Sequence, residues 1–402
     1  MCACGHRFDD VRILEAVAPD LFWLPDRHVQ VAATLAHADD LFGQLTEVLF
    51  AYQAQPGGTI GLEEVPAGAV SRTTVISVAS LPRSVPLLAA DVLTTLRAAV
   101  EHTLFAEVEH ANRRPLTAVE ARLIEMPAAL TAEKFEGWVR DRMKKGAPKP
   151  LHLGSPLLER MRKLQPYQRS GSPGEHPMAL LADHSNLAKH RMPAVAALRL
   201  AMIRPDDGTP VDPRVRIPNP VEGPVKVGDV LAETPRGVRV PVSLFPTVGL
   251  NRPGTDRWPV LVKELDAIAS WVRTQAVPIL ITGTPDVDPL PAGFDIVQGH
   301  DDERAAIGAG TQTTARDRYR RRLDVAIVRM DLPELIAAHP DQPDRGPIDR
   351  WVASLGDDEL LERMGRFRAG RTVAAAERTF RLVETMLAEV RTFEAQGTAE
   401  YT

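Results

Sequence analysis

The chain has 402 residues, of which 44% are hydrophobic and 25% charged, so it can bury a sizeable core and its composition excludes wholesale disorder. A formal net charge of -5 provides no global basic field, so an anionic partner would need a local basic surface. Two cysteines cannot build a disulfide framework, and no stretch stays apolar for about 18 residues. We therefore expect a cytoplasmic globular protein with no secretory signal and no membrane span.

Cofactor motifs are absent from the sequence. Cys2, Cys4 and His6 have a spacing that metal ligands can adopt, but no second half of such a site follows. The phosphate-binding GxxxxGK loop, the GxGxxG turn and the GxSxG elbow do not occur either. We therefore expect no metal and no cofactor.

The first part of the chain predicts two long helices on either side of a short strand. Over residues 31–52, apolar residues recur every three or four positions, which is typical of an amphipathic helix. Residues 70–78 alternate apolar and polar and include several β-branched residues, which indicates a strand. Pro86 precedes a second helix over 87–110, since a missing N–H is harmless in the first turn of a helix.

The middle of the chain predicts shorter elements. Residues 205–255 are rich in Pro, Gly and Val with little helical period, and the best strand candidate there is 238–244. Helices are expected at 131–144, 156–164, 178–190 and 258–280.

A cluster of Pro, Gly and Asp at 282–293 predicts a domain boundary. Helical patterns follow at 302–338, 349–368 and 371–395. In the last of these, apolar residues between Val373 and Val390 form a seam suited to another helix, either in the same chain or in a partner. The expected fold class is mainly α: residues 1–281 form a helical bundle with a small β-strand insertion, and residues 290–402 form a C-terminal helical extension.

Two polar clusters interrupt the apolar helical stretches and are the candidate site. Arg97 and His102 lie five positions apart in the helix at 87–110, and Asp91 shares a strip of that helix with His102. The helix at 178–190 and the residue after it supply the second cluster. Its members are Asn186, Lys189, His190 and Arg191. Such residues cost desolvation energy on a core-facing helix unless they are paired, so they form either a network or a site.

These residue types are sufficient for metal-independent RNA cleavage. A histidine can remove the 2′-OH proton, and an arginine can stabilise the charge that develops on the phosphorane oxygens. In this hypothesis His102 is the general base or acid, Arg97 holds the phosphate, and the remaining residues support the site. The partner would be RNA or a nucleotide.

The alternative hypothesis is a non-catalytic helical scaffold or partner-binding module that uses the seam at 373–390. Here Arg97 pairs with Glu101, and His102 is hydrogen-bonded either to a backbone carbonyl or to His190, both histidines being buried in the second case. Residues 189–191 are then simply a basic helix C-terminus that interacts with the helix dipole.

A resemblance rests on the same residues. The stretch from Arg97 to His102 fits the Arg-x4–6-His pattern of the HEPN superfamily, whose helical domains are often dimeric ribonucleases or nucleotide binders. Residues 31–280 also resemble a family of uncharacterised bacterial helical proteins with an Asn-x-x-Lys-His-Arg stretch, matched here by residues 186–191. Ala90, Thr94 and Thr95 depart from that family's pattern. The resemblance implies a helical bundle with a small β element, and the HEPN pattern implies a homodimer.

A basic run is the last candidate surface. It could bind phosphates, or it could be a solvated helix face balanced by Asp317 and Asp324, which is the interpretation we favour. The run consists of Arg316, Arg318, Arg320, Arg321 and Arg322.

Overall fold

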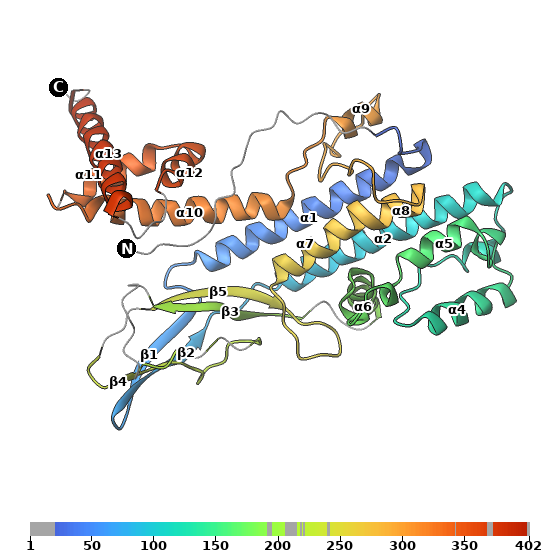
Figure 1. Ribbon diagram of the computed structural model, residues 1–402, viewed down its shortest axis with the longest axis horizontal. Coiled ribbons are helices and arrows are strands. Elements are labelled where there is room, and N and C mark those ends of the chain that lie inside the picture. Colours follow the sequence, from blue (N-terminus) through green and yellow to red (C-terminus); the bar gives the residue numbers. More distant parts are fainter. Residues whose placement is uncertain are drawn as a thin grey trace.

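The computed structural model describes residues 21–190, 195–205, 215–217, 219, 222–238, 242–341, 343–367 and 373–399. It is mainly α, as expected, and elongated, with the β-strands along one side and the last helices at one end (Figure 1). None of the helices in these ranges is both long enough and apolar enough to cross a membrane.

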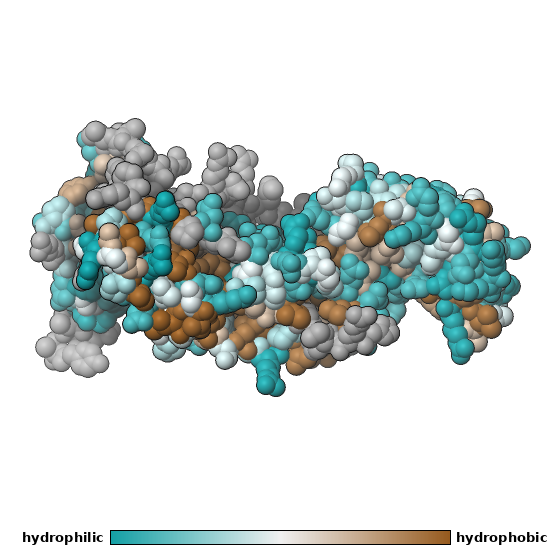
Figure 2. Space-filling model, turned by 90° about the horizontal axis from the view of Figure 1, so that it is seen from below, coloured by the Kyte–Doolittle hydropathy of each residue, from teal (hydrophilic) through white to brown (hydrophobic). Residues whose placement is uncertain are grey.

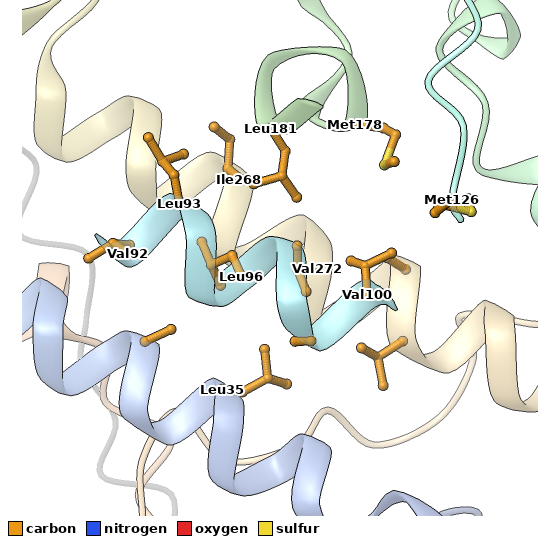
Figure 3. Close-up of a cluster of buried hydrophobic side chains, with 14 of the residues drawn as sticks. Leu35, Val92, Leu93, Leu96, Val100, Met126, Met178, Leu181, Ile268 and Val272 are labelled. Carbon is orange, nitrogen blue, oxygen red and sulfur yellow. The ribbon is translucent and has the colours of Figure 1, made fainter. Parts of the chain in front are cut away.

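Two long antiparallel helices, α1 (Val29–Gln53) and α2 (Ser84–Asn112), form the centre of the molecule (Figure 1). The spacing in the sequence explains this pairing, because the apolar stripe of each helix is buried against the other. Leu35 of α1 lies on one side of α2, and Leu181 and Ile268 lie on the other side (Figure 3). Both helices extend a few residues beyond the predicted ranges.

The helix predicted at 258–280 is confirmed from Leu261 onward, and it contains a π-helical turn in its middle. It consists of α7 (Leu261–Trp271), a π-helical turn (Val272–Ala276) and α8 (Val277–Thr282). All three segments contribute to the main core. Helix α6 (Pro177–His190) packs on α2 through Met178 and Leu181 (Figure 3).

Short helices cover the far end of α2 (Figure 1). Side chains of Thr117, Thr131 and Ser155 accept hydrogen bonds from backbone N–H groups in the first turns of three of them, so each begins where a capping residue stands. The elements are α3 (Ala118–Ala121), α4 (Ala132–Lys144), the 3₁₀ turn η2 (Lys149–Leu151) and α5 (Pro156–Lys163).

Over the residues that the structure describes, the β portion contains two antiparallel sheets, so it is larger than the small insertion that the sequence predicted. One sheet has the order β1-β2-β4 and the other pairs β3 with β5. Val75, Leu200 and Leu231 form a small core with contributions from both sheets. The predicted strand at 70–78 is confirmed, and the predicted strand at 238–244 corresponds to β5, which begins later. The strands are β1 (Ile60–Ala67), β2 (Val70–Val78), β3 (Ala196–Pro205), β4 (Val230–Pro235) and β5 (Val242–Leu250).

The C-terminal helices form a second hydrophobic core. Helix α10 belongs to both cores, since Ala315 is buried in the first and Leu332 in the second. Leu290 and Ile307 still belong to the first core, so that core continues past the boundary predicted at 282–293. The helices are α9 (Glu303–Gly308), α10 (Ala315–Ala337), α11 (Arg345–Ser354), α12 (Asp357–Gly365) and α13 (Val373–Ala399).

The seam predicted on the last helix is occupied within the chain. Val383, Leu387 and Val390 of α13 are buried in the second core together with residues of α10 and α11. Of the two occupants that the sequence left open, the structure therefore contains the one in the same chain.

Candidate functional site

Arg97 is buried and fully engaged. Its side chain is 9% exposed, its Nη2 donates to the carbonyl oxygen of Met126 at 2.5 Å, and it forms an ion pair with Glu101 one turn further along α2. Its Nη1 lies 3.9 Å from Sδ of Met178 in α6. The Arg97–Glu101 pair that the alternative hypothesis predicted is thus present.

The same ion pair also fixes the backbone at Met126. While Arg97 donates to the carbonyl of Met126, the N–H of Met126 donates to Oε2 of Glu101 at 3.0 Å. Burial raises the pKa of Glu101, and the neighbouring Arg97 opposes that shift. Both backbone groups of one residue are therefore satisfied by one buried ion pair, which attaches the segment between α3 and α4 to α2.

His102 lies on a different side of α2 and is exposed. It shares its strip with Asp91, which is also exposed, whereas Arg97 points into the core. Five residues on an ideal helix correspond to a rotation of about 140°, which explains the divergence. The structure does not bring the predicted catalytic pair together within one chain, and the predicted burial of His102 in the alternative hypothesis is wrong.

The α6 cluster also lies apart from Arg97. Arg97 contacts Met178 in the first turn of α6, and Asn186 comes eight residues later, about 12 Å further along the helix axis. Asn186 and Lys189 are exposed. His190 is the last residue of α6, and Arg191 lies outside the described residues, as do Cys2, Cys4 and His6.

The buried histidine of α6 is His184, which the sequence analysis did not single out as a site residue. Its side chain is 2% exposed, and neither ring nitrogen has a hydrogen-bond partner in the described structure. Burial, reinforced by the nearby Arg252, lowers the pKa of His184 to about 4. The ring is therefore neutral at pH 7 and acts as a core side chain.

A second buried ion pair network centres on Glu107 of α2. Nε and Nη2 of Arg27 lie 2.9 and 2.7 Å from Oε1 of Glu107, and Nε2 of His28 lies 2.7 Å from the same oxygen. Glu107 follows Val100 and Leu104 on the apolar stripe of α2, so its position did signal a buried carboxylate. Its partners come from distant parts of the chain and give no local signal.

The basic run of α10 is neutralised residue by residue. Arg316 pairs with Asp266 of α7 at 2.5 Å, and Arg318 pairs with Asp39 of α1 at 2.8 Å. The other three pair with Asp324, Asp358 and Glu47. The run therefore links α10 to α1, α7 and α12 through ion pairs. Of the two predicted acidic partners, Asp324 pairs with Arg320, whereas Asp317 accepts from the N–H of Thr314 at the start of the helix.

One open hollow of about 830 Å³ lies beside the first turns of α10. Its lining includes Asp40, Phe294 and Asp301, together with Asp39 and Asp302. The last two carboxylates are already used: Asp39 accepts from Arg318, and Asp302 caps α9. Among the residues that the structure describes, no group of His, Cys, Asp or Glu side chains is arranged to hold a metal ion.

No family model, no curated protein and no solved structure matches this chain. The HEPN-like resemblance and the homodimer therefore remain predictions. Arg97 and Glu107 are thus buried in ion pairs within the chain, whereas Asp91, His102, Asn186 and Lys189 face solvent.

Proposed function

We propose that this protein is a non-catalytic helical scaffold that binds a macromolecular partner. The observation that carries the proposal is the closed contact around Met126, in which Arg97 and Glu101 satisfy each other and the two backbone groups of that residue. A guanidinium in this position supports the fold.

The RNA-cleavage hypothesis makes heavier demands on the same residues. Arg97 would have to leave both partners to reach a phosphate, and Glu101 would remain as a partly buried carboxylate without its cation. His102 would also need to reach the same scissile group from another side of α2. The scaffold hypothesis requires neither movement.

The elongated arrangement of two cores supports a scaffold as well. Helix α10 contributes Ala315 to one core and Leu332 to the other, and its arginines attach it to both sides. A continuous helix of 23 residues spans about 35 Å, so surfaces at its two ends are held at a defined separation.

Catalysis is tested by incubating the purified full chain and a His102→Ala variant with mixed RNA. We expect the RNA to stay intact with both proteins. RNA cleavage by the wild type that disappears in His102→Ala but persists in a His110→Ala control would overturn the proposal, because His110 is an exposed histidine on the same helix.

The structural role of Arg97 is tested separately, by measuring the stability of two variants. Arg97→Ala leaves the Met126 carbonyl without its donor and Glu101 without its cation, so we expect a loss of stability of about 2–4 kcal/mol in urea unfolding. His102→Ala removes an exposed side chain and should change stability by less than about 0.5 kcal/mol. A larger loss of stability in His102→Ala than in Arg97→Ala would contradict this role.

Partner binding is tested on protein recovered from its native cells at low salt. Native mass spectrometry is expected to show the chain together with a second kind of molecule, above the 44.0 kDa of one chain. Recovery as a bare monomer would count against the scaffold.

A further inference from the structure

The end of the molecule formed by residues 113–169 is strongly basic. This segment contains thirteen Lys and Arg against six Asp and Glu, a formal charge of +7, so the rest of this chain of net charge -5 carries -12. The segment includes α3, α4, η2 and α5. These elements lie together at the end of the molecule opposite the C-terminal helices (Figure 1).

The carboxylates of this segment are almost all used internally. Glu120 pairs with Arg114, Glu125 with Arg142, Glu136 and Glu159 with Arg162, and Asp141 with Lys145. The remaining acidic residue, Glu133, lies in the first turn of α4, where its own backbone N–H and Thr131 lower the pKa of the carboxyl. The acidic residues therefore have little capacity left to neutralise further cations.

Among the described residues of this segment, seven exposed cations have no carboxylate partner, and one of them, Lys163, donates instead to the carbonyl oxygen of Gly283, so six are left over. Within the described structure none of them has a carboxylate oxygen within 4.0 Å, and all six side chains face solvent. Arg140 and Lys144 are one turn apart on α4, so their charges act on the same surface. The set, called here the basic end, consists of Arg113, Arg122, Lys134, Arg140, Lys144 and Lys149.

The composition of the basic end favours a phosphate backbone over an acidic protein as its partner. Protein interfaces are depleted of lysine, but half of these cations are lysines. The segment also exposes Val119, Leu130, Met143 and Leu153, each in a different helix or loop. The aromatic rings of α4 are already covered: Arg142 lies over Trp138 and Arg162 over Phe135. Hydrophilic side chains cover most of this end in the view from below (Figure 2).

We propose that the basic end binds the phosphate backbone of a nucleic acid without reading its sequence. The inference rests on the proposed function, because it names the partner of the scaffold. Since the aromatic rings of α4 are covered by arginines, the contact is electrostatic and relies on released counterions. If all six cations contact phosphates, the logarithm of the affinity falls with the logarithm of salt concentration with a slope of about -5.

The test uses the full chain and fluorescence anisotropy with a labelled RNA duplex and a DNA duplex of the same sequence. Binding of either duplex, with a salt slope between about -3 and -6, supports the proposal, and the stronger of the two identifies the natural source of the phosphates. In Arg140→Glu/Lys144→Glu the affinity should fall at least about tenfold and the slope should decrease in magnitude by about 2.

The matched control is Arg83→Glu/Arg236→Glu, which changes the net charge equally at two exposed arginines outside the basic end. It should bind within about twofold of the wild type. Lys134→Gln/Lys149→Gln provides a milder second variant should the charge reversals disturb α4, and circular dichroism checks the helix content of each protein.

Three results would overturn the inference. They are binding of polyglutamate in preference to both duplexes, no binding of any of these polymers, and equal losses of affinity in the charge-reversal and control variants. A chain that binds neither duplex but is recovered with a protein partner would remove this inference and leave the scaffold proposal in place.

Discussion

Nε2 of His28 lies 2.7 Å from Oε1 of Glu107, although the two residues are 79 positions apart in the sequence. Arg27 donates to the same oxygen, and Nη1 of Arg160 lies 3.4 Å from the other one while donating to the carbonyls of Leu280 and Ile281. Burial favours a raised pKa for Glu107, but hydrogen bonds from His28 and Arg27 hold its pKa below the usual value. One carboxylate thus connects the turn that precedes α1, the middle of α5 and the end of α8 to α2.

Replacing this carboxylate is expected to destabilise the main core. Glu107→Gln keeps the shape of the side chain but leaves His28 and two arginines facing a neutral group, so the free energy of unfolding should fall by about 3–5 kcal/mol. Urea unfolding followed by circular dichroism measures the change. Glu109→Gln, on an exposed position of the same helix, is the control and should stay within about 0.5 kcal/mol of the wild type. Equal effects of the two substitutions would show that the Glu107 network does not support the fold.

The lowered pKa of His184 predicts how the free energy of unfolding depends on pH. Because its pKa is about 4 in the folded chain and near 6.5 in the unfolded chain, the unfolded state binds more protons between these values. Stability contributed by the neutral ring is therefore fully present above about pH 6.5 and falls as the pH is lowered toward 4. The shift corresponds to about 3 kcal/mol in total, of which about 2 kcal/mol is lost by pH 5.

The measurement compares urea unfolding of the wild type and His184→Leu at pH 7.5 and pH 5. Leucine is suitable because neither ring nitrogen of His184 has a hydrogen bond to lose. The variant should gain about 2 kcal/mol relative to the wild type on acidification. His176, whose pKa is also lowered to about 4, titrates in both proteins and cancels in the difference. A constant difference between the two proteins would contradict the assignment.

Local patterns predicted the helices well because burial in this fold follows the helical period. The stripe that includes Leu35, Leu45 and Leu49 gave α1 to within two residues, and Thr131 marked the start of α4. The sequence does not indicate the π-helical turn at Val272–Ala276, because its apolar residues continue the period of α7.

The strands were harder to predict because their burial departs from simple alternation. In β2 the fully buried residue is Val75, while Ile76 is 50% exposed, and register shifts interrupt the pairing with both neighbours. One pairing partner of β2 is adjacent, since β1 ends three residues before it begins, but the other partner, β4, is more than 150 residues away, and no local signal specifies that pairing.

The candidate site was also only partly predictable, because its contacts join residues that are far apart in the sequence. The sequence placed Arg97 correctly on a core-facing helix and named Glu101 as a neighbour, because that pair is four residues apart. The backbone of Met126, which both side chains bind, lies 25 residues or more away. Without it the same arginine is equally consistent with a phosphate clamp.

Gly310, which lines the open hollow beside α10, has no room for a side chain. A Cβ atom at this position would lie 2.7 Å from the carbonyl oxygen of Gly293 and 2.8 Å from Cβ of Pro291. The neighbouring Thr311 donates to that same Gly293 oxygen at 2.8 Å, so the two segments cannot separate without losing this bond. Gly310→Ala should therefore lower stability by about 1–3 kcal/mol.

Thermal unfolding measures this loss against Gly308→Ala, where the added methyl group meets no atom within 4 Å. That control should be neutral or slightly stabilising, because alanine restricts the unfolded chain more than glycine does. Similar losses in both variants would mean that the close approach of residues 293 and 310 contributes nothing.

The second core predicts local unfolding confined to one end of the molecule. Leu332 of α10 is completely buried among residues of the second core, so Leu332→Ala creates a cavity and should cost about 2–5 kcal/mol. Hydrogen exchange is expected to accelerate in the C-terminal half of α10 and in α11 to α13. The first half of α10 should stay protected, because Arg316 and Arg318 attach it to Asp266 and Asp39 outside that core. Met330→Ala, which truncates a 64% exposed side chain two residues earlier, should leave exchange unchanged. Acceleration that spreads equally into α1 and α2 would instead mean that the two cores unfold as one cooperative unit, with α10 transmitting the loss through its arginine pairs.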